Sequence, residues 1–137
     1  MKLDPSAFVA DSELILALEK HSTAISCSGD RGLFNQGDDP QGLYILDRGE
    51  ITLTMTSPRG DQIMHAQAQA GSLLGLPALI GNEPYTLTAI ARTGAQLSFV
   101  PREDFTSLMQ SNPLLALKIL QVLAAEVRSA RSALFNA

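Results

Sequence analysis

The segment FNQGDDPQGLYILDRGEITLTM, residues 34–55, decides the fold because it joins two turns to two short apolar runs. A Gly37-Asp38 turn precedes the run LYIL, and a second turn at residues 47–50 leads into the run EITLTM. Gly and Asp are favoured in turns, and the second run alternates apolar residues with threonine. This alternation is typical of a strand with one buried face. The segment therefore predicts two antiparallel strands joined by a tight turn.

Turn signals of the same kind recur from Ser22 to Pro101, with further short alternating runs such as LTAIA between them. Regularly spaced turns and period-two runs are typical of an antiparallel roll or barrel. Turns are expected at Gly29-Asp30, Gly37-Asp38, Arg48-Gly49, Arg59-Gly60, Gly81-Asn82 and Thr93-Gly94.

On either side of this region the apolar spacing becomes helical. Asp4-Pro5 predicts a short helical turn, and Asp11 or Ser12 is expected to cap a helix. The whole chain is expected to be one α+β domain, an antiparallel β-roll of the double-stranded β-helix or jelly-roll type with an N-terminal helix and a long C-terminal dimerisation helix. Its expected parts are the N-terminal helical part at residues 1–21, the β-roll at residues 22–101 and the C-terminal helices at residues 102–137.

Length and charge restrict the function classes. The 137 residues suit one domain with one core, and the 45% of hydrophobic residues supply an ordinary packed interior. Acidic residues outnumber basic ones by 14 to 10, which gives a formal net charge of −4. Because a nucleic-acid-binding module is usually basic on one face, we expect no direct nucleic acid binding by this chain.

The remaining composition indicates a cytoplasmic protein that does not enter a membrane. The single cysteine, Cys27, excludes an internal disulfide and suits a reducing compartment. No apolar run approaches the roughly 18 residues of a membrane span, and the start MKLDPSAFVADSE lacks the apolar core of a signal peptide. The sequence has no nucleophile elbow, phosphate-binding loop, dinucleotide fingerprint or metal-ligand spacing, so we expect neither an enzyme nor a metal site.

The last helix is expected to run from about Pro113, after the capping residue Asn112, to Phe135. At 1.5 Å per residue it would be about 34 Å long, which is more than a compact domain of this size needs. Its first half is expected to be buried on nearly all sides, and its second half has a single apolar seam.

The spacing along this seam follows a heptad repeat, the pattern of a coiled coil. We expect the helix to pack first on its own roll and then to pair with a copy of itself in a parallel homodimer. The alternative is that the whole stripe covers the roll of the same subunit. The seam residues are Ala116, Leu120, Leu123, Val127, Ala130 and Leu134.

A glycine-rich corner, AGSLLGLPAL at residues 70–79, precedes the run YTLTAIA. Together with residues 34–55, it resembles the cyclic-nucleotide-binding domain of the catabolite-activator and fumarate-nitrate-regulator family, and the resemblance covers nearly the whole chain. It implies that the corner cradles a cyclic phosphate. In that family the corner reads Gly-Glu-hydrophobic-Ala-Leu and is followed by Arg-Ser/Thr-Ala. The glutamate accepts a hydrogen bond from the ribose hydroxyl, and the arginine pairs with the phosphate.

This sequence departs from the family pattern at both residues. Leu76 stands in the place of the glutamate and Tyr85 in the place of the arginine, while Pro77 lacks an N–H donor. A hydrogen bond to a charged group contributes about 1.5–3 kcal/mol, so losing two of them costs roughly two to four decades in affinity. Cyclic AMP and cyclic GMP are therefore expected to bind weakly or not at all, and no cofactor is predicted.

The corner remains a candidate pocket. Gly71 and Gly75 allow close approach of a ligand, and a short helix over residues 76–80 would offer free N–H groups. The leucines of the corner would make the pocket apolar, with the Tyr85 hydroxyl as one polar group. It could be filled by its own side chains, hold a small apolar or aromatic effector, or retain some nucleotide binding. The candidate pocket residues are Gly71, Ser72, Leu73, Leu74, Gly75, Leu76, Pro77, Ala78, Tyr85 and Thr86.

The sequence thus predicts a non-catalytic effector-sensing or interaction module, with a possible small-molecule effector and a possible heterodimer with a full-length regulator. The resemblance implies that effector binding moves the corner against the dimer helix. In the family's transcription factors a helix-turn-helix follows this helix, whereas this chain ends at Asn136-Ala137. We expect either a sensor half alone or a domain cut from a longer regulator. The alternatives are the regulatory domain of a DNA-binding regulator and a structural dimer with a filled pocket.

Overall fold

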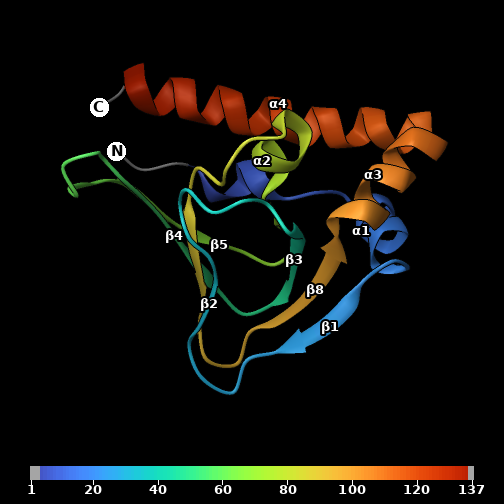
Figure 1. Cartoon of the computed structure of the whole chain (residues 1–137), viewed down its shortest axis with the longest axis horizontal. Helices are drawn as coiled ribbons and strands as arrows, with labels where there is room; N and C mark the ends of the chain where they lie inside the picture. The colour runs from blue at the N-terminus through green and yellow to red at the C-terminus, as the bar shows by residue number, and fades with distance from the viewer. Residues whose placement is uncertain (1–3, 136–137) are drawn as a thin grey trace.

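A computed structural model describes residues 4–135, and its centre is a roll of two four-stranded sheets (Figure 1). Residues 1–3 of the expected N-terminal part and the chain end Asn136-Ala137 lie outside this range. The first sheet has the order β1-β8-β3-β6 and the second β2-β7-β4-β5, and every pairing is antiparallel. The strands are β1 (Thr23–Ser26), β2 (Arg31–Phe34), β3 (Gly42–Arg48), β4 (Ile51–Thr56), β5 (Gln62–Ala68), β6 (Leu73–Leu74), β7 (Thr88–Ala91) and β8 (Gln96–Pro101).

The predicted α+β fold class and the β-roll are confirmed, because the turns lie where the sequence placed them. Several of the turn glycines adopt the positive φ angles that glycine reaches without steric cost, and Asn82 is the one non-glycine residue with a positive φ in the described range. The glycines of this kind at predicted turns are Gly37, Gly49, Gly60 and Gly94.

Strand β3 separates two apolar cores, which explains why LYIL is a continuous apolar run. Leu46 lies in the core inside the roll, together with Phe34, Leu53 and Leu97. Leu43 and Ile45 lie on the opposite face, in a second core between the roll and the helices. A strand that is buried on both faces reads as a continuous hydrophobic run instead of an alternating one.

The helices begin at the predicted caps. The Asp4 carboxylate accepts a hydrogen bond from the Ser6 amide at the start of η1, and Asp11 accepts one from the Leu14 amide at the start of α1. Asn112 does the same for the Leu115 amide in α4. Each carboxylate or amide oxygen satisfies a backbone donor that the first turn leaves free. The helices are η1 (Pro5–Phe8), α1 (Ser12–Glu19), α2 (Leu76–Gly81), α3 (Arg102–Ser111) and α4 (Pro113–Phe135).

Helix α4 crosses one side of the roll, with α2 beneath it (Figure 1). Leu115, Ile119 and Val122 are buried in the core between the helices and the roll. Lys118 forms salt bridges with Asp11 and Glu13 at 3.1 and 3.2 Å, which tie α4 to the start of α1. The helix is thus fixed to its own domain by one face.

The prediction that the first half of α4 is buried on nearly all sides is wrong. Leu114, Leu117 and Leu120 are 65%, 52% and 49% exposed. A helix that lies across a domain buries only the face turned toward it, and here that face contains Leu115, Ile119 and Val122. The alternative in which the whole seam covers the roll of the same subunit is therefore also wrong, since Leu120 and Leu134 point away from it.

Among the described helices, none is on its own both long and apolar enough to cross a membrane. Helices α3 and α4 reach that length and composition only as a pair, and the pair is bent by 117°.

Gly42, at the start of β3, is expected to be the glycine least tolerant of a side chain. A Cβ there would lie 2.3 Å from the Val100 carbonyl oxygen and 2.6 Å from the Phe99 ring. We expect Gly42→Ala to lower the free energy of unfolding by roughly 2–3 kcal/mol, because overpacking forces the β3–β8 pairing apart. Urea denaturation measures this, with Gly32→Ala in β2 as the control, because nothing lies within 4 Å of its Cβ. Equal destabilisation by both substitutions would contradict the prediction.

Candidate functional site

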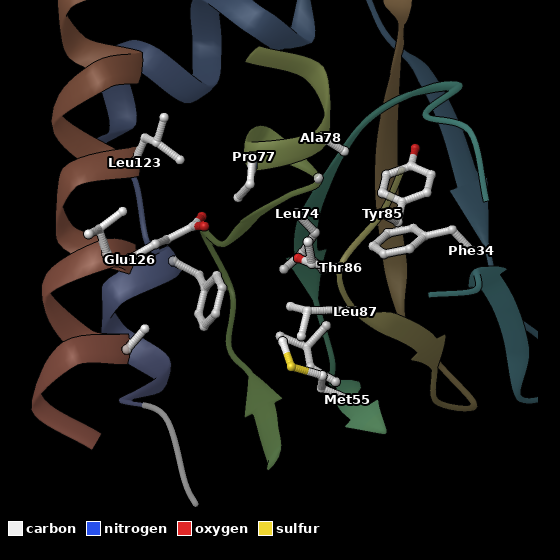
Figure 2. Close-up of a pocket in the computed structure, with 15 residues that line it drawn as sticks. Phe34, Met55, Leu74, Pro77, Ala78, Tyr85, Thr86, Leu87, Leu123 and Glu126 are labelled. Atoms are coloured by element: carbon white, nitrogen blue, oxygen red, sulfur yellow. The ribbon is translucent and has the colours of Figure 1, made fainter. Parts of the chain in front are cut away.

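A cavity of about 200 Å³ lies between the roll, α2 and α4. Figure 2 shows the corner and the roll on one side and α4 on the other. Six of the candidate pocket residues line it, and three seam residues close it from α4. The candidate pocket residues in the lining are Leu74, Gly75, Pro77, Ala78, Tyr85 and Thr86, and the α4 residues are Leu123, Glu126, Val127 and Ala130. Phe8, Phe34, Leu53, Met55 and Leu87 complete the lining.

The other four candidate pocket residues do not line this cavity. Leu73 and Leu76 are fully buried in the core between the roll and the helices. Ser72 is buried and its hydroxyl donates to the Gln69 carbonyl at 2.6 Å, while Gly71 faces Val9 and Ile15. The expectation that Leu73 and Leu76 make the pocket apolar is wrong. Its apolar character comes from Leu74, from the aromatic rings and from α4.

Gly75 is the residue immediately before α2, and its φ angle is +105°. A Cβ there would lie 3.1 Å from the Tyr85 ring and 3.3 Å from the Gly42 carbonyl oxygen. Glycine is therefore required by both the backbone angle and the space. The expected short helix follows as α2, with Pro77 in its first turn.

Tyr85 forms a wall of the cavity instead of supplying a polar group to it. Its ring stacks on Phe34 with the centroids 3.9 Å apart (Figure 2). Its hydroxyl donates to the Gly42 carbonyl at 2.9 Å and accepts from the Gln41 amide at 3.1 Å. Burial raises the pKa of this phenol, so it remains neutral. The expectation that the hydroxyl serves the pocket is wrong, because a buried phenol takes the nearest backbone partners.

Glu126 is the one acidic side chain among the described residues that line the cavity, and the sequence analysis did not identify it. Its side chain extends from α4 toward the space between the helix and the roll (Figure 2). The residue as a whole is partly buried, and its Oε1 is buried without a hydrogen-bond partner among the described residues. Burial raises its pKa to about 8, since removing the carboxylate from water disfavours the charged form.

A second hollow, of about 280 Å³, shares Phe34 and Tyr85 with the first. Its polar lining includes Asp38 and Asp39 in the turn before β3, together with Gln41. Both aspartates are exposed, so the turn chemistry predicted for them is sufficient to explain their presence. Cys27 is buried in the core inside the roll, and His65 is exposed on β5.

Comparison with known proteins identifies the family. Residues 24–112 match the family described as "Cyclic nucleotide-binding domain". The match covers the roll, the corner, α2 and α3, and the chain therefore belongs to this family. The resemblance to the sensor domains of the catabolite-activator and fumarate-nitrate-regulator family is confirmed as well.

The chain is similar in sequence and structure to bacterial regulators. It is 30% identical over 122 residues to the "Cyclic AMP receptor protein" of Thermus thermophilus, covering 89% of this chain and 56% of the relative. The crystal structure of the Thermus thermophilus "Catabolite Activator Protein" superimposes with a TM-score of 0.77 at 25% identity, over 96% of this chain and 62% of that one. The chain thus spans a little over half of the curated relative.

A third similar structure is itself a single domain. It is the N-terminal domain of a transcriptional regulator from Streptomyces coelicolor A3(2), with a TM-score of 0.67 and 26% identity. The match covers 95% of this chain and 93% of that structure. The chain accordingly has the size and architecture of an effector sensor domain of bacterial regulators.

Proposed function

We propose that this chain is a non-catalytic sensor that binds a small effector other than a cyclic nucleotide in the cavity beneath α4. The observation that carries the proposal is the cavity itself, which is lined by the corner that the resemblance implies for ligand binding and, on the α4 side, by Glu126. The filled-pocket alternative is less well supported, because the corner leaves about 200 Å³ open.

The lining argues against an anionic ligand. Among the described residues around the cavity there is no lysine and no arginine, and the one charged type is Glu126. The Tyr85 hydroxyl is held by Gly42 and Gln41, and Leu76 is turned into the other core. A cyclic phosphate would thus lose its charged partner and meet a carboxyl group in a site of low polarity, where such unpaired charges are costly.

The exposure of the seam residues supports association of two copies of the chain through α4. Leu120, Val127 and Leu134 are 49%, 43% and 65% exposed, while the opposite face of the helix packs on the domain. An exposed apolar stripe with heptad spacing is typical of a parallel coiled-coil partner. The occupant proposed for this stripe is a second copy of the chain, and a longer regulator with the same seam would be a possible heterodimer partner.

Three residues of α4 connect the cavity to the seam. Leu123, Val127 and Ala130 line the cavity and also belong to the heptad seam. A ligand that moves these side chains would alter how two copies of α4 pack, and pairing would in turn alter affinity for the ligand. This is the coupling proposed between effector and output.

The affinity for cyclic nucleotides tests the proposal. We expect calorimetry to give dissociation constants for cyclic AMP and cyclic GMP about a hundredfold to ten-thousandfold weaker than micromolar, because two charge-assisted contacts are missing. The Thermus thermophilus cyclic AMP receptor protein, titrated in parallel, controls for the quality of the nucleotides. A low-micromolar constant for this chain would overturn the proposal.

The second candidate function is the regulatory part of a longer DNA-binding regulator. The observation that favours it is the share of the relatives that the chain spans, 56% of one and 62% of another. The coding sequence around this segment distinguishes the two, because a helix-turn-helix downstream would support the longer regulator.

A further inference from the structure

From the chemistry of the cavity we propose its ligand class: a small apolar molecule, about the size of one aromatic ring with a short chain, that carries a protonated amine and pairs it with Glu126. The inference rests on the proposed function, since it specifies what the same cavity binds. Three observations support it, namely the isolation of the carboxyl group, the nature of the walls and the volume.

Glu126 is isolated where a ligand would meet it. Its Oε1 is buried without a hydrogen-bond partner in the part of the chain that the structure describes, and Figure 2 shows it pointing from α4 into the cavity. Buried polar atoms are almost always hydrogen-bonded, so an orphan in a native site indicates a missing partner. An N–H donor from a ligand would satisfy this oxygen.

The rest of the lining selects a positive charge over a negative one. No basic side chain lies among the described lining residues. The other titratable group in the lining is the Tyr85 phenol, whose hydroxyl donates a hydrogen bond to the Gly42 carbonyl. An ammonium group would form a charge pair with the carboxylate, which is the arrangement that makes a buried charge tolerable.

The volume and the apolar walls of the cavity determine the size and the apolar character of the rest of the ligand. The cavity is about 200 Å³, and a cavity of about 150 Å³ lined by aliphatic and aromatic side chains accommodates benzene. Leu53, Met55 and Leu87 supply the apolar surface away from Glu126. The site therefore fits one aromatic ring joined by a short chain to the amine.

Formation of the charge pair with the amine changes the protonation state of Glu126. The raised pKa means that Glu126 carries a proton in the empty cavity at neutral pH, and the ammonium ion stabilises the charged form. Binding of the protonated amine should therefore release about one proton per site at neutral pH, and this proton goes to the buffer.

Three matched probes test the inference on the full 137-residue chain. Phenethylamine, phenethyl alcohol and hydrocinnamate share an apolar body and differ in charge. We expect calorimetry to show the amine binding at least about tenfold more tightly than either of the others. Repeating the titration in buffers of different ionisation enthalpy should show proton release with the amine alone.

The variants separate the carboxyl group from the cavity. Glu126→Gln should remove both the amine preference and the proton release, while the affinity for phenethyl alcohol stays the same. Glu103→Gln, an exposed acid on α3 that does not line the cavity, should behave as the wild type. Unchanged amine binding by Glu126→Gln would overturn the inference.

The outcomes also distinguish this inference from the proposed function. Equal or tighter binding of the alcohol or hydrocinnamate by the wild type overturns the amine assignment and leaves the sensor cavity supported. Failure of all three probes to bind overturns the amine assignment and removes the support that the cavity gives to a small-molecule sensor.

Discussion

Raising the pH from about 5 to about 9 is expected to lower the free energy of unfolding of the wild type by roughly 4 kcal/mol through Glu126, and Glu126→Gln is expected to lose this contribution. The reason is the raised pKa of the buried carboxyl group, about 8 against a normal value of 4.5. Chemical denaturation at several pH values, at one fixed protein concentration, measures the effect.

The sign follows from the protons bound by each state. Below pH 4.5 the carboxyl group is neutral in both the folded and the unfolded chain, so its ionisation costs nothing. Between 4.5 and about 8 the unfolded chain ionises first, and stability falls as the pH rises. Above about 8 the folded chain carries a buried carboxylate and the full cost is present.

Glu19 changes stability in the same direction and has to be separated from Glu126. A hydrogen bond with Asp47, together with burial and the repulsion between the two carboxylates, raises the pKa of Glu19 to about 7. Glu19 is present in both proteins, so the difference between wild type and Glu126→Gln isolates Glu126. At pH 5 the two should have similar stability, and at pH 9 the variant should be the more stable. Parallel pH profiles would show that Glu126 is not buried as a charge.

The elements could be read from the sequence because their signals are local. Asp11 and Asn112 are caps whose side chains bond amides three residues on, and Gly37 and Gly49 occupy turns that require positive φ. Such features depend on neighbours in the chain and not on the tertiary structure. The limits of α4, Pro113 and Phe135, therefore coincide with the predicted ones.

The directions of the corner side chains could not be read in the same way. Leu74 and Leu76 are both apolar and both follow a glycine-rich turn, yet one faces the cavity and the other the helical core. The positive φ of Gly75 rotates the chain between them, so neither period two nor period 3.6 applies across it. Tyr85 lines the cavity together with the corner, but its hydroxyl donates a hydrogen bond to the carbonyl of Gly42, which is distant in the sequence.

Glu126 was missed because a charged residue beside a heptad seam is normally solvated. One signal was available, since Glu126 is the only acidic residue in α4 and lies between the seam residues Leu123 and Ala130. Only the position of the roll beneath α4 shows that this flank is covered. The candidate site could thus be located from the sequence, while its acidic group could not.

Leu120→Glu is expected to convert the proposed homodimer into a monomer at micromolar concentration. Burying a leucine contributes about 1.5–3 kcal/mol, and the substitution occurs on both copies, so the dissociation constant should rise at least about a hundredfold. Light scattering should give a mass near twice 14.6 kDa for the wild type and near 14.6 kDa for the variant. Leu120 is half exposed and does not line the cavity, so the fold of each subunit should remain intact.

Leu114→Glu is the matched control, because it places the same charge on the same helix. Leu114 is 65% exposed, as a seam residue would be, but it lies outside the heptad positions. It should leave the dimer in place. A general effect of charge on α4 would instead weaken pairing in both variants, and a monomeric wild type would exclude the seam as an interface between copies. Because Leu123 and Val127 belong both to the seam and to the cavity, loss of pairing in Leu120→Glu should also change the affinity for any ligand beneath α4.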